Sequence, residues 1–352
     1  TGKLDANVAS ADGKYPFFTC SKKPLRIASY SYDCECVLVA GNGDLNVKYY
    51  NGKFDAYQRT YIVESVDKGK LLVKYLYYFL DSYIETLRSQ SIGGVIKYIK
   101  LGNLTNALML LPDVKTQEKI IQTLDSCQNA IEKRQKQFYL LNDLVKSRFV
   151  ELFGTFPTNE KGWITGTIRD VISEARYGSS RPAVDGGQYP YLRMNNITYG
   201  GELDLSDVKR INVPDNELEK CTVRRGDVLF NRTNSRELVG KTCVYNRDEM
   251  MVLAGFVIRV RVNTEILPEF LSAFLNTDFS KQMLLGMCKT AIGQANINAQ
   301  ELQNIGLYIP PIDLQRKFVE FKAQADKSKL AVQKSLDELE TLKKSLMQQY
   351  FG

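Results

Sequence analysis

One segment of this sequence occurs twice, and this repeat limits the possible fold more than any other feature. Residues 112–119 (PDVKTQEK) correspond to residues 310–317 (PPIDLQRK), and Phe153-Gly154 corresponds to Phe351-Gly352, both 198 positions apart and without a gap. Identities in the same register include Gln117 with Gln315, Gln135-Lys136 with Gln333-Lys334, Leu141 with Leu339, and Lys146-Ser147 with Lys344-Ser345. Repetition on this scale predicts two copies of one structural unit.

Both copies have the apolar spacing of a long helix with a single apolar stripe, in which residues alternate in steps of three and four. In the first copy the stripe is Ile120, Leu124, Cys127, Ile131, Phe138, Leu141, Val145 and Leu152, with Gln117, Arg134 and Arg148 at its polar positions. In the second copy it is Leu314, Phe318, Phe321, Ala325, Val332, Leu339, Leu342 and Leu346. Proline near each start and Gly154 or Gly352 at each end are the expected helix boundaries.

A helix with one apolar stripe needs a partner, because the stripe is unfavourable in water. The partner of matching length is the other copy, so we expect the two helices to pair as an antiparallel coiled coil. The alternative is that each stripe packs only on its own neighbouring domain. A continuous helix over residues 113–153 has a length of roughly 60 Å at about 1.5 Å per residue.

The repeat divides the chain into four predicted parts: a first domain at 1–112, a central long helix at 113–154, a second domain at 155–309 and a C-terminal long helix at 310–352. Short β-branched or aromatic runs between turn residues predict strands in both domains. Helices are expected at 71–89 and 267–285. The predicted class is α+β, with two mixed α/β domains separated by two paired long helices in a pseudo-twofold internal repeat.

The two domains also correspond to each other, more loosely than the helices do. Gly2 followed by Tyr15-Pro16-Phe17 matches Gly178 followed by Tyr189-Pro190-Tyr191. Residues 163–176 have no counterpart before Gly2, so we expect the first domain to lack its opening strand and turn, on the order of 15 residues by this comparison of repeats. The N-terminal start of the first domain is therefore predicted to be missing.

Composition excludes several classes of catalytic site. The chain has no histidine, which rules out Ser-His and Cys-His pairs and zinc sites with histidine ligands. Seven cysteines at irregular positions fit reduced thiols in the cytoplasm, not a disulfide framework. No P-loop and no dinucleotide-binding glycine pattern occurs, and Gly41-Asn42-Gly43-Asp44 is typical of a hairpin turn. We expect no catalytic residues, no metal, no cofactor and no membrane segment in this chain.

A net charge of +7 is compatible with a polyanionic partner. The second domain has a loop, residues 231–236 (NRTNSR), that combines guanidinium and carboxamide groups, and these groups recognise guanine and adenine edges in the major groove. The alternative is a solvated turn with helix-capping Asn and Ser. Two similar domains joined by a rod that is as long as about 18 base pairs favour recognition of double-stranded DNA.

These features together resemble the specificity subunit of type I restriction-modification enzymes, in which two target recognition domains are each followed by a long helix. The resemblance rests on residues 112–119 and 310–317, on 15–21 (YPFFTCS) and on Gly226-Asp227-Val228-Leu229. It implies a noncatalytic subunit whose domains each read half of a bipartite site. The helices would fix the gap and dock two modification subunits, which use S-adenosylmethionine to methylate adenine. Restriction subunits with motor and nuclease activity are further implied partners.

The predicted base or phosphate contacts are polar residues of the loops in both domains. They are Lys22, Lys23, Asn42, Lys48 and Arg59 in the first domain, and Arg176, Arg181, Arg193, Asn195, Asn196, Arg232, Asn234, Arg236 and Lys241 in the second. Two other functions remain open from the residues alone. One is a noncatalytic coiled-coil scaffold without DNA binding, and the other is a stand-alone nuclease or methyltransferase, which the missing motifs disfavour.

Overall fold

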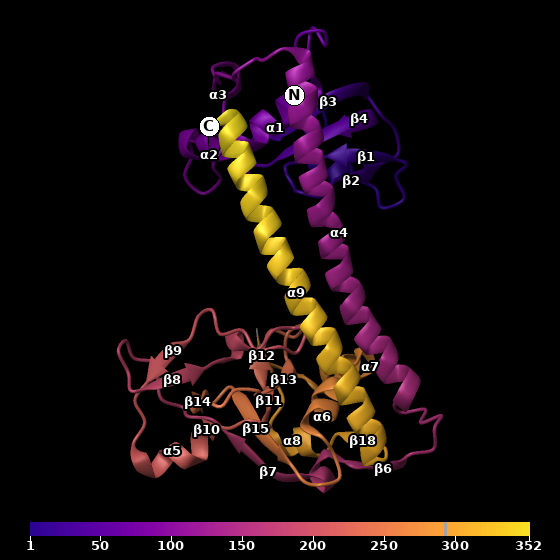
Figure 1. The fold of residues 1–352 in the computed structure, drawn as a ribbon, viewed down its shortest axis with the longest axis vertical. Coiled ribbons are helices and arrows are strands. Elements are labelled where there is room, and N and C mark those ends of the chain that lie inside the picture. The colour runs from indigo at the N-terminus through magenta and orange to yellow at the C-terminus, as the bar shows by residue number, and fades with distance from the viewer. Residues whose placement is uncertain (292–293) are drawn as a thin grey trace. The chain divides into compact units, whose positions relative to one another are not determined.

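The computed structural model describes residues 1–291 and 294–352 and divides into two compact units. The first unit comprises Thr1–Gln137 and Ala331–Gly352, and the second comprises Phe138–Leu330. Each unit contains one β-rich domain and half of each of two long helices, α4 (Val114–Phe153) and α9 (Ile312–Phe351) (Figure 1). No helix in the described residues combines the length and apolar character needed to cross a bilayer.

The first unit is built on one five-stranded sheet with the strand order β2-β1-β4-β3-β5. Three helices, α1, α2 and α3, follow the sheet in the chain, and α1 packs on it through Phe79 and Leu80, which share a core with Val37 and Val39. The elements are η1 (Ala6–Val8), β1 (Tyr15–Phe18), β2 (Leu25–Ile27), β3 (Tyr32–Ala40), β4 (Val47–Ala56), β5 (Thr60–Val63), α1 (Val73–Ser82), α2 (Ile84–Gln90) and α3 (Leu101–Thr105).

The second unit distributes its strands over several small sheets, with the orders β13-β11-β15-β7, β10-β14-β8-β9, β12-β17-β16 and β18-β6. The first elements are β6 (Ile164–Thr167), η2 (Ile168–Val171), β7 (Ile172–Tyr177), β8 (Tyr189–Leu192), η3 (Met194–Asn196), β9 (Lys209–Ile211), α5 (Asp215–Cys221), β10 (Thr222–Val223), β11 (Val228–Asn231) and β12 (Thr233–Asn234). The remaining elements are β13 (Thr242–Val244), β14 (Met251–Leu253), β15 (Val257–Val262), α6 (Pro268–Leu275), α7 (Asp278–Met287), β16 (Lys289–Ala291), β17 (Gln294–Asn296), α8 (Ala299–Gln303) and β18 (Gly306–Ile309).

The two domains repeat the same strand pairings, as their sequences suggested. Tyr15-Pro16-Phe17 of β1 pairs antiparallel with β2, and Tyr189-Pro190-Tyr191 of β8 pairs with β9 in the same register. On the other side, β1 pairs in parallel with the end of β4, and β8 pairs in parallel with β14. The loose correspondence in the sequence therefore reflects a shared fold.

The two long helices pair antiparallel within each unit. In the first unit the thiol of Cys127 donates to the carbonyl of Leu339, and Lys343 donates to Gln128 at 2.9 Å. In the second unit the rings of Phe149 and Phe318 lie 5.2 Å apart. The residue numbers of the contacting positions on α9 therefore decrease as those on α4 increase, which is the antiparallel arrangement. The predicted pairing of the two long helices is confirmed.

Equivalent glutamines join each helix to its domain. Gln117 and Gln315 are fully buried. Gln117 accepts a hydrogen bond from the amide of Leu72 and donates to the carbonyls of Lys70 and Pro112. Gln315 accepts from the amide of Leu267 and donates to Glu265 and Pro310 in the same way. The polar positions Gln117 and Gln315 are therefore anchors between helix and domain.

Near the ends of the long helices, the buried residues differ from those of the predicted apolar stripe. Phe149 and Phe153 are buried because they pack on Phe270 of α6, whereas the neighbouring Leu152 is only partly covered. Leu342 of α9 is 50% exposed, although its spacing placed it in the stripe. The spacing describes a helix that faces one partner, while these ends of the helices face a domain as well.

The helices expected at 71–89 and 267–285 are each broken into two. The first divides into α1 and α2 at Tyr83, where the hydroxyl of Ser82 donates to the carbonyl of Phe79. The second divides into α6 and α7, because the side chain of Thr277 accepts from the amide of Ser280 and starts a new helix. Side-chain hydrogen bonds of Ser and Thr to the backbone favour such interruptions. The expected hairpin at residues 41–44 is present between β3 and β4.

Candidate DNA interface

The loop that follows β11 holds Arg232 in a fixed backbone position in the second unit. The amide of Arg232 donates to the carbonyl of Phe256, and its carbonyl accepts from the amide of Ile297. The guanidinium lies 4.8 Å from the centre of the Tyr177 ring, which is a cation–π contact. Arg232 is therefore held in place from two sides before any ligand binds.

Arg232 lines a hollow of about 470 Å³ that also includes three other predicted contacts, Arg181, Arg193 and Asn195. Arg193 and Arg232 each have an Nε group for which the described residues supply no hydrogen-bond partner. Phe256, on the wall of the same hollow, is 54% exposed. The hollow therefore combines arginine side chains with an accessible aromatic face, and these groups suit the phosphates, edges and faces of nucleotides.

Three of the predicted arginines pair with carboxylates of their own unit. Arg181 donates to both oxygens of Glu217, and Arg193 donates to Asp207 at 2.8 Å. Arg176 pairs with Glu174. The carboxylates of Glu217 and Asp207 are exposed, and such pairs contribute about 0–1 kcal/mol to stability, so a phosphate group can replace these two carboxylates at small cost. Glu174 is largely buried, so its pair with Arg176 is not replaced in this way.

Two other predicted contacts are buried and bonded within the second unit. Asn196 is 2% exposed and bridges the amide of Arg193 and the carbonyls of Asp204 and Asp207. Lys241 is 7% exposed and donates to the carbonyl of Met194, and burial holds the pKa of its ammonium below the usual range. These contacts give both residues a role in positioning the loops around the hollow.

Two residues of the loop itself differ in accessibility. Asn234 lies in the short strand β12 and is half-buried, with its side-chain carbonyl accepting from the amide of Ser235. Arg236 is exposed. A direct contact with DNA by these two residues stays a prediction.

The predicted contacts of the first unit form a less basic surface. Lys22 and Lys48 line a common hollow of about 260 Å³, but Lys22 pairs with Asp44 at 3.4 Å. Lys48 is half-buried and bonds to Asn46, and burial lowers the pKa of its ammonium. Asn42 is half-buried beside Tyr98. The other two predicted contacts, Lys23 and Arg59, are exposed.

The two units share one backbone frame at this site but differ in their side chains. In the first unit the amide of Gly41 donates to Arg59, and the carbonyl of Gly41 accepts from Ile99. These bonds match those of Arg232 with Phe256 and Ile297 in the second unit. Gly41 of the first unit thus corresponds to Arg232 of the second, and Arg59 corresponds to Phe256. The same ligand would therefore contact different side chains in the two units.

Sequence reasoning missed Tyr177 and Phe256, which complete the site around Arg232. Phe256 lies at the turn between β14 and β15, and Tyr177 lies at the end of β7, far from the polar loop in sequence. An aromatic residue at a strand end is usually part of a core, so its type alone gave no signal. The hydroxyl of Tyr177 accepts from the amide of Ala299, which fixes the ring under the guanidinium.

A buried ionic cluster supports the strand that carries Tyr177. Glu174 of β7 accepts from Arg259 and Arg261 of β15, and Arg261 also donates to the buried Asp227. Burial alone would raise the pKa of Glu174, but Arg259, Arg176 and Arg261 outweigh this effect and lower it. The described residues contain no group of three His, Cys, Asp or Glu side chains that could hold a metal.

Known proteins share this sequence and fold. The family model "Type I restriction modification DNA specificity domain" matches residues 2–138 and 160–341. The EcoDI specificity subunit of Escherichia coli is 25% identical over 390 residues, which cover 100% of this chain and 85% of that protein. The EcoKI specificity subunit of E. coli K12 is 22% identical, with 76% of this chain and 62% of that protein covered.

Solved structures agree in fold. The S subunit of a type I restriction-modification system from M. genitalium superposes with a TM-score of 0.61 at 17% identity, covering 100% of this chain and 92% of that one. A chain from a structure that addresses assembly and conformational transition of the type I R-M system gives a TM-score of 0.56 at 15% identity, covering 98% and 92%. Since the family model matches most of the sequence, this chain belongs to the type I restriction-modification specificity family, as a noncatalytic subunit with DNA-binding target recognition domains.

Proposed function

We propose that the two target recognition domains read the two halves of a bipartite, asymmetric DNA site. The observation that supports this proposal is the shared backbone frame with unlike side chains, Gly41 with Arg59 in one unit and Arg232 with Phe256 in the other. Equivalent backbone positions direct their side chains in the same way, whereas different side chains select different bases. Twelve of the fourteen predicted contacts, those of the hollow around Arg232 first, are the residues proposed to bind bases or phosphates. The other two, Asn196 and Lys241, are proposed to position the loops, because their polar groups are bonded inside the unit.

The paired helices are proposed to fix the gap between the two half-sites. Each helix is continuous over 40 residues and is therefore about 60 Å long at about 1.5 Å per residue. The buried glutamines Gln117 and Gln315 attach each helix to a domain through three hydrogen bonds, so that little freedom remains at either junction. A rigid connection of this length can set a fixed number of base pairs.

The partners proposed for the helices are two modification subunits. Large apolar side chains are exposed on the helices of the second unit, among them Tyr139 at 69%, Leu140 at 56% and Leu330 at 73%. Exposed apolar patches are typical of protein interfaces, so these side chains are proposed to lie under the modification subunits. The modification subunits would bring S-adenosylmethionine and methylate adenine, restriction subunits would join as motor and nuclease, and the complex would act in the cytoplasm.

A mobility-shift experiment tests this function. The chain is mixed with double-stranded DNA of mixed sequence at low salt, with and without modification subunits from the same cell. We expect weak, salt-sensitive binding by the chain alone and sequence-specific binding with adenine methylation by the complex. Failure to bind DNA in both mixtures would instead favour a scaffold function for the paired helices.

A further inference from the structure

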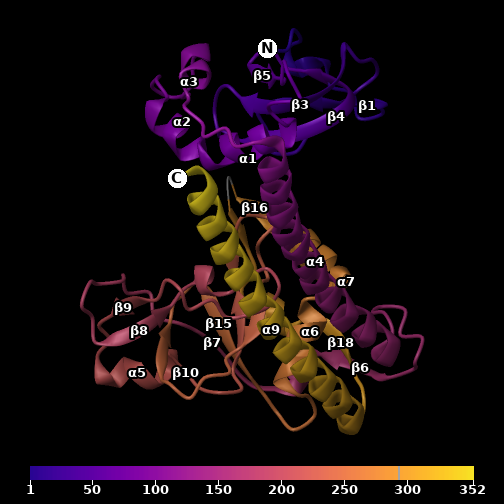
Figure 2. The same cartoon turned by 45° about the horizontal axis from the view of Figure 1, so that its top comes forward.

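The first unit carries an exposed loop beside Gly41, a position of its candidate DNA interface. This loop, residues 92–98, lies in the chain between α2 and α3, which are labelled in Figure 2. The amide of Gly43 donates to the carbonyl of Lys97 at 2.9 Å. The amide of Ile99, the residue after the loop, donates to the carbonyl of Gly41 at 2.9 Å. One end of the loop is therefore attached to the interface.

The second unit has β17 at the same place. The amide of Ile297 donates to the carbonyl of Arg232, and this bond is the equivalent of the one between Ile99 and Gly41. Antiparallel pairing continues from this bond in both units, with β12 in the second and with the hairpin after β3 in the first. The loop 92–98 is therefore the counterpart of the segment that runs beside Arg232.

Two apolar side chains occupy the tip of this loop. Val95 is 103% exposed and Ile96 is 62% exposed. The turn needs glycine at Gly93, whose φ is 116° and where a Cβ atom would lie 2.5 Å from the carbonyl oxygen of Ile96. The amides of Ile92 and Tyr98 donate to each other's carbonyls at 3.0 and 2.8 Å and close the base of the loop. The fold therefore presents Val95 and Ile96 to solvent on a closed turn.

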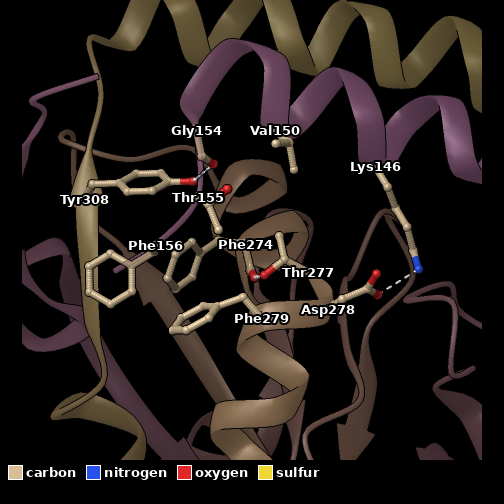
Figure 3. Close-up of a pocket in the computed structure, with 10 residues that line it drawn as sticks. All are labelled: Lys146, Val150, Gly154, Thr155, Phe156, Phe274, Thr277, Asp278, Phe279 and Tyr308. Atoms are coloured by element: carbon tan, nitrogen blue, oxygen red, sulfur yellow. Dashed lines mark hydrogen bonds and ion pairs between the residues drawn. The ribbon is translucent and has the colours of Figure 1, made fainter. Parts of the chain in front are cut away.

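Apolar side chains near the surface of the second unit cover one another instead. Phe156 lines a hollow of about 170 Å³, and its ring packs edge to face with those of Phe274 at 5.8 Å and Tyr308 at 5.9 Å (Figure 3). Removal of such surfaces from water stabilises a fold. Side chains as exposed as those at the tip of the loop gain no such packing, so the fold alone does not account for their apolar type.

The charge around the tip suits the major groove of duplex DNA. Lys97 and Lys100 are exposed, and so is Arg59, whose carbonyl accepts from the amide of Gly41. Cations beside an apolar tip match the phosphates that flank the base edges of a duplex, whereas lysine is depleted at protein interfaces. The major groove admits a β-ribbon, and the apolar group that a base presents there is the C5-methyl of thymine.

We propose that Val95 and Ile96 read thymine in the half-site of the first unit, through contact with the C5-methyl group in the major groove. This inference rests on the proposed function and adds to it a base feature that one unit selects. An aliphatic side chain makes no hydrogen bond to a base edge, so the methyl group is the feature it distinguishes. The first unit would then use apolar contact where the second offers the guanidinium of Arg232.

Replacement of thymine by deoxyuridine tests the proposal, because it removes only the methyl group. The probe is a duplex that carries the site of the complete complex, found from a map of methylated adenines, with deoxyuridine at one thymine position at a time. The half-site of the first unit is the one that Arg232→Ala leaves unchanged. We expect at least one position in it at which deoxyuridine weakens binding about 4-fold, as for the loss of one buried methyl-sized group.

A variant of the loop and a matched control assign the methyl contact. Val95→Ser combined with Ile96→Ser should bind the thymine duplex about 4-fold more weakly and should bind the thymine and deoxyuridine duplexes equally. Val66→Ser is the control, because Val66 is 105% exposed in the same unit and follows the end of β5 that points away from Gly41. The control should keep the full preference for thymine.

The outcomes separate this inference from the proposed function. No loss at any deoxyuridine position of that half-site would overturn the inference and leave the proposed function intact. An equal loss in the serine variant would also overturn it, since another residue would then contact the methyl group. So would a serine variant that no longer binds the modification subunits but keeps its preference for thymine, because the loop would then be a protein interface. A complex that selects no site at all would refute the proposed function and this inference with it.

Discussion

Removing one heptad from each long helix should shorten the gap between the half-sites and leave their sequences unchanged. The deletions are Phe138–Leu144 in α4 and Leu336–Leu342 in α9, which are equivalent positions of the repeat. A deletion of seven residues keeps the apolar stripe in register, because the stripe repeats every seven residues. The anchors at Gln117 and Gln315 and the loops around Arg232 lie outside both deletions.

The expected size of the change comes from helix geometry. Seven residues at about 1.5 Å per residue shorten each helix by about 10.5 Å. This length corresponds to about three base pairs at about 3.4 Å each. Three base pairs also turn the duplex by about 100°, while a heptad returns the stripe to nearly the same face. We therefore expect a gap that is about three base pairs shorter and a slower methylation of that site.

The assay is a map of methylated adenines in DNA from cells that carry the complete system with the deleted chain. The control variant keeps the helix length and replaces two exposed residues, Lys136→Ala and Glu338→Ala, and should leave the gap unchanged. Half-sites with new sequences at an unchanged gap would refute the reasoning, since they would show that the helices do not set the spacing.

Three further predictions concern single residues. Arg232→Ala should weaken the complex about 5- to 150-fold and relax only the half-site read by the second unit, as measured by methylation of a library of sites, because a bidentate arginine–guanine contact contributes about 1–3 kcal/mol. Gln315→Leu should lower the free energy of urea unfolding by about 3 kcal/mol, since three hydrogen bonds are lost and buried backbone groups stay unpaired. Glu174→Gln should destabilise the second unit by about 3 kcal/mol at pH 7, because Arg259 is 2% exposed. The folded pKa of Glu174 is lowered, so its contribution is present above about pH 4.3 and is lost as the pH falls through the folded value, and the variant should flatten this part of a pH–stability curve.

The repeated part of the sequence predicted the helices and their pairing, because an apolar stripe is a local pattern with one physical meaning. The sequence could not predict which residues at the end of each helix pack on a domain. Phe149 and Phe153 are buried against Phe270, a residue more than a hundred positions away in the chain. The β-branched or aromatic runs between turn residues did predict strands, and β11 and β15 are two of them, but composition could not predict that these two strands pair with each other.

The candidate site divides in the same way. Arg232 was predicted from its type, since guanidinium groups in a polar loop suggest base recognition, and its contact with DNA stays a prediction. Tyr177, which lies under its guanidinium, was not predicted. Its strand β7 is brought near the loop by β15, which pairs with both β7 and β11, and this pairing is not visible in the sequence. Lys241 and Asn196 have the residue types of DNA contacts, but burial commits their polar groups to Met194, Asp204 and Asp207.

Two kinds of contact orient the arginine side chains of the second unit before any DNA binds. Arg181 and Arg193 each pair with an exposed or half-exposed carboxylate, which fixes the direction of the guanidinium at a cost of about 1 kcal/mol or less when a phosphate replaces it. Arg232 has no such partner among the described residues and is held by the Tyr177 ring, whose face leaves the outer edge of the guanidinium without a competing anion. Phosphate contacts give affinity and base contacts give sequence selectivity. The paired arginines are therefore suited to positioning the duplex, and the arginine on the ring is suited to reading it.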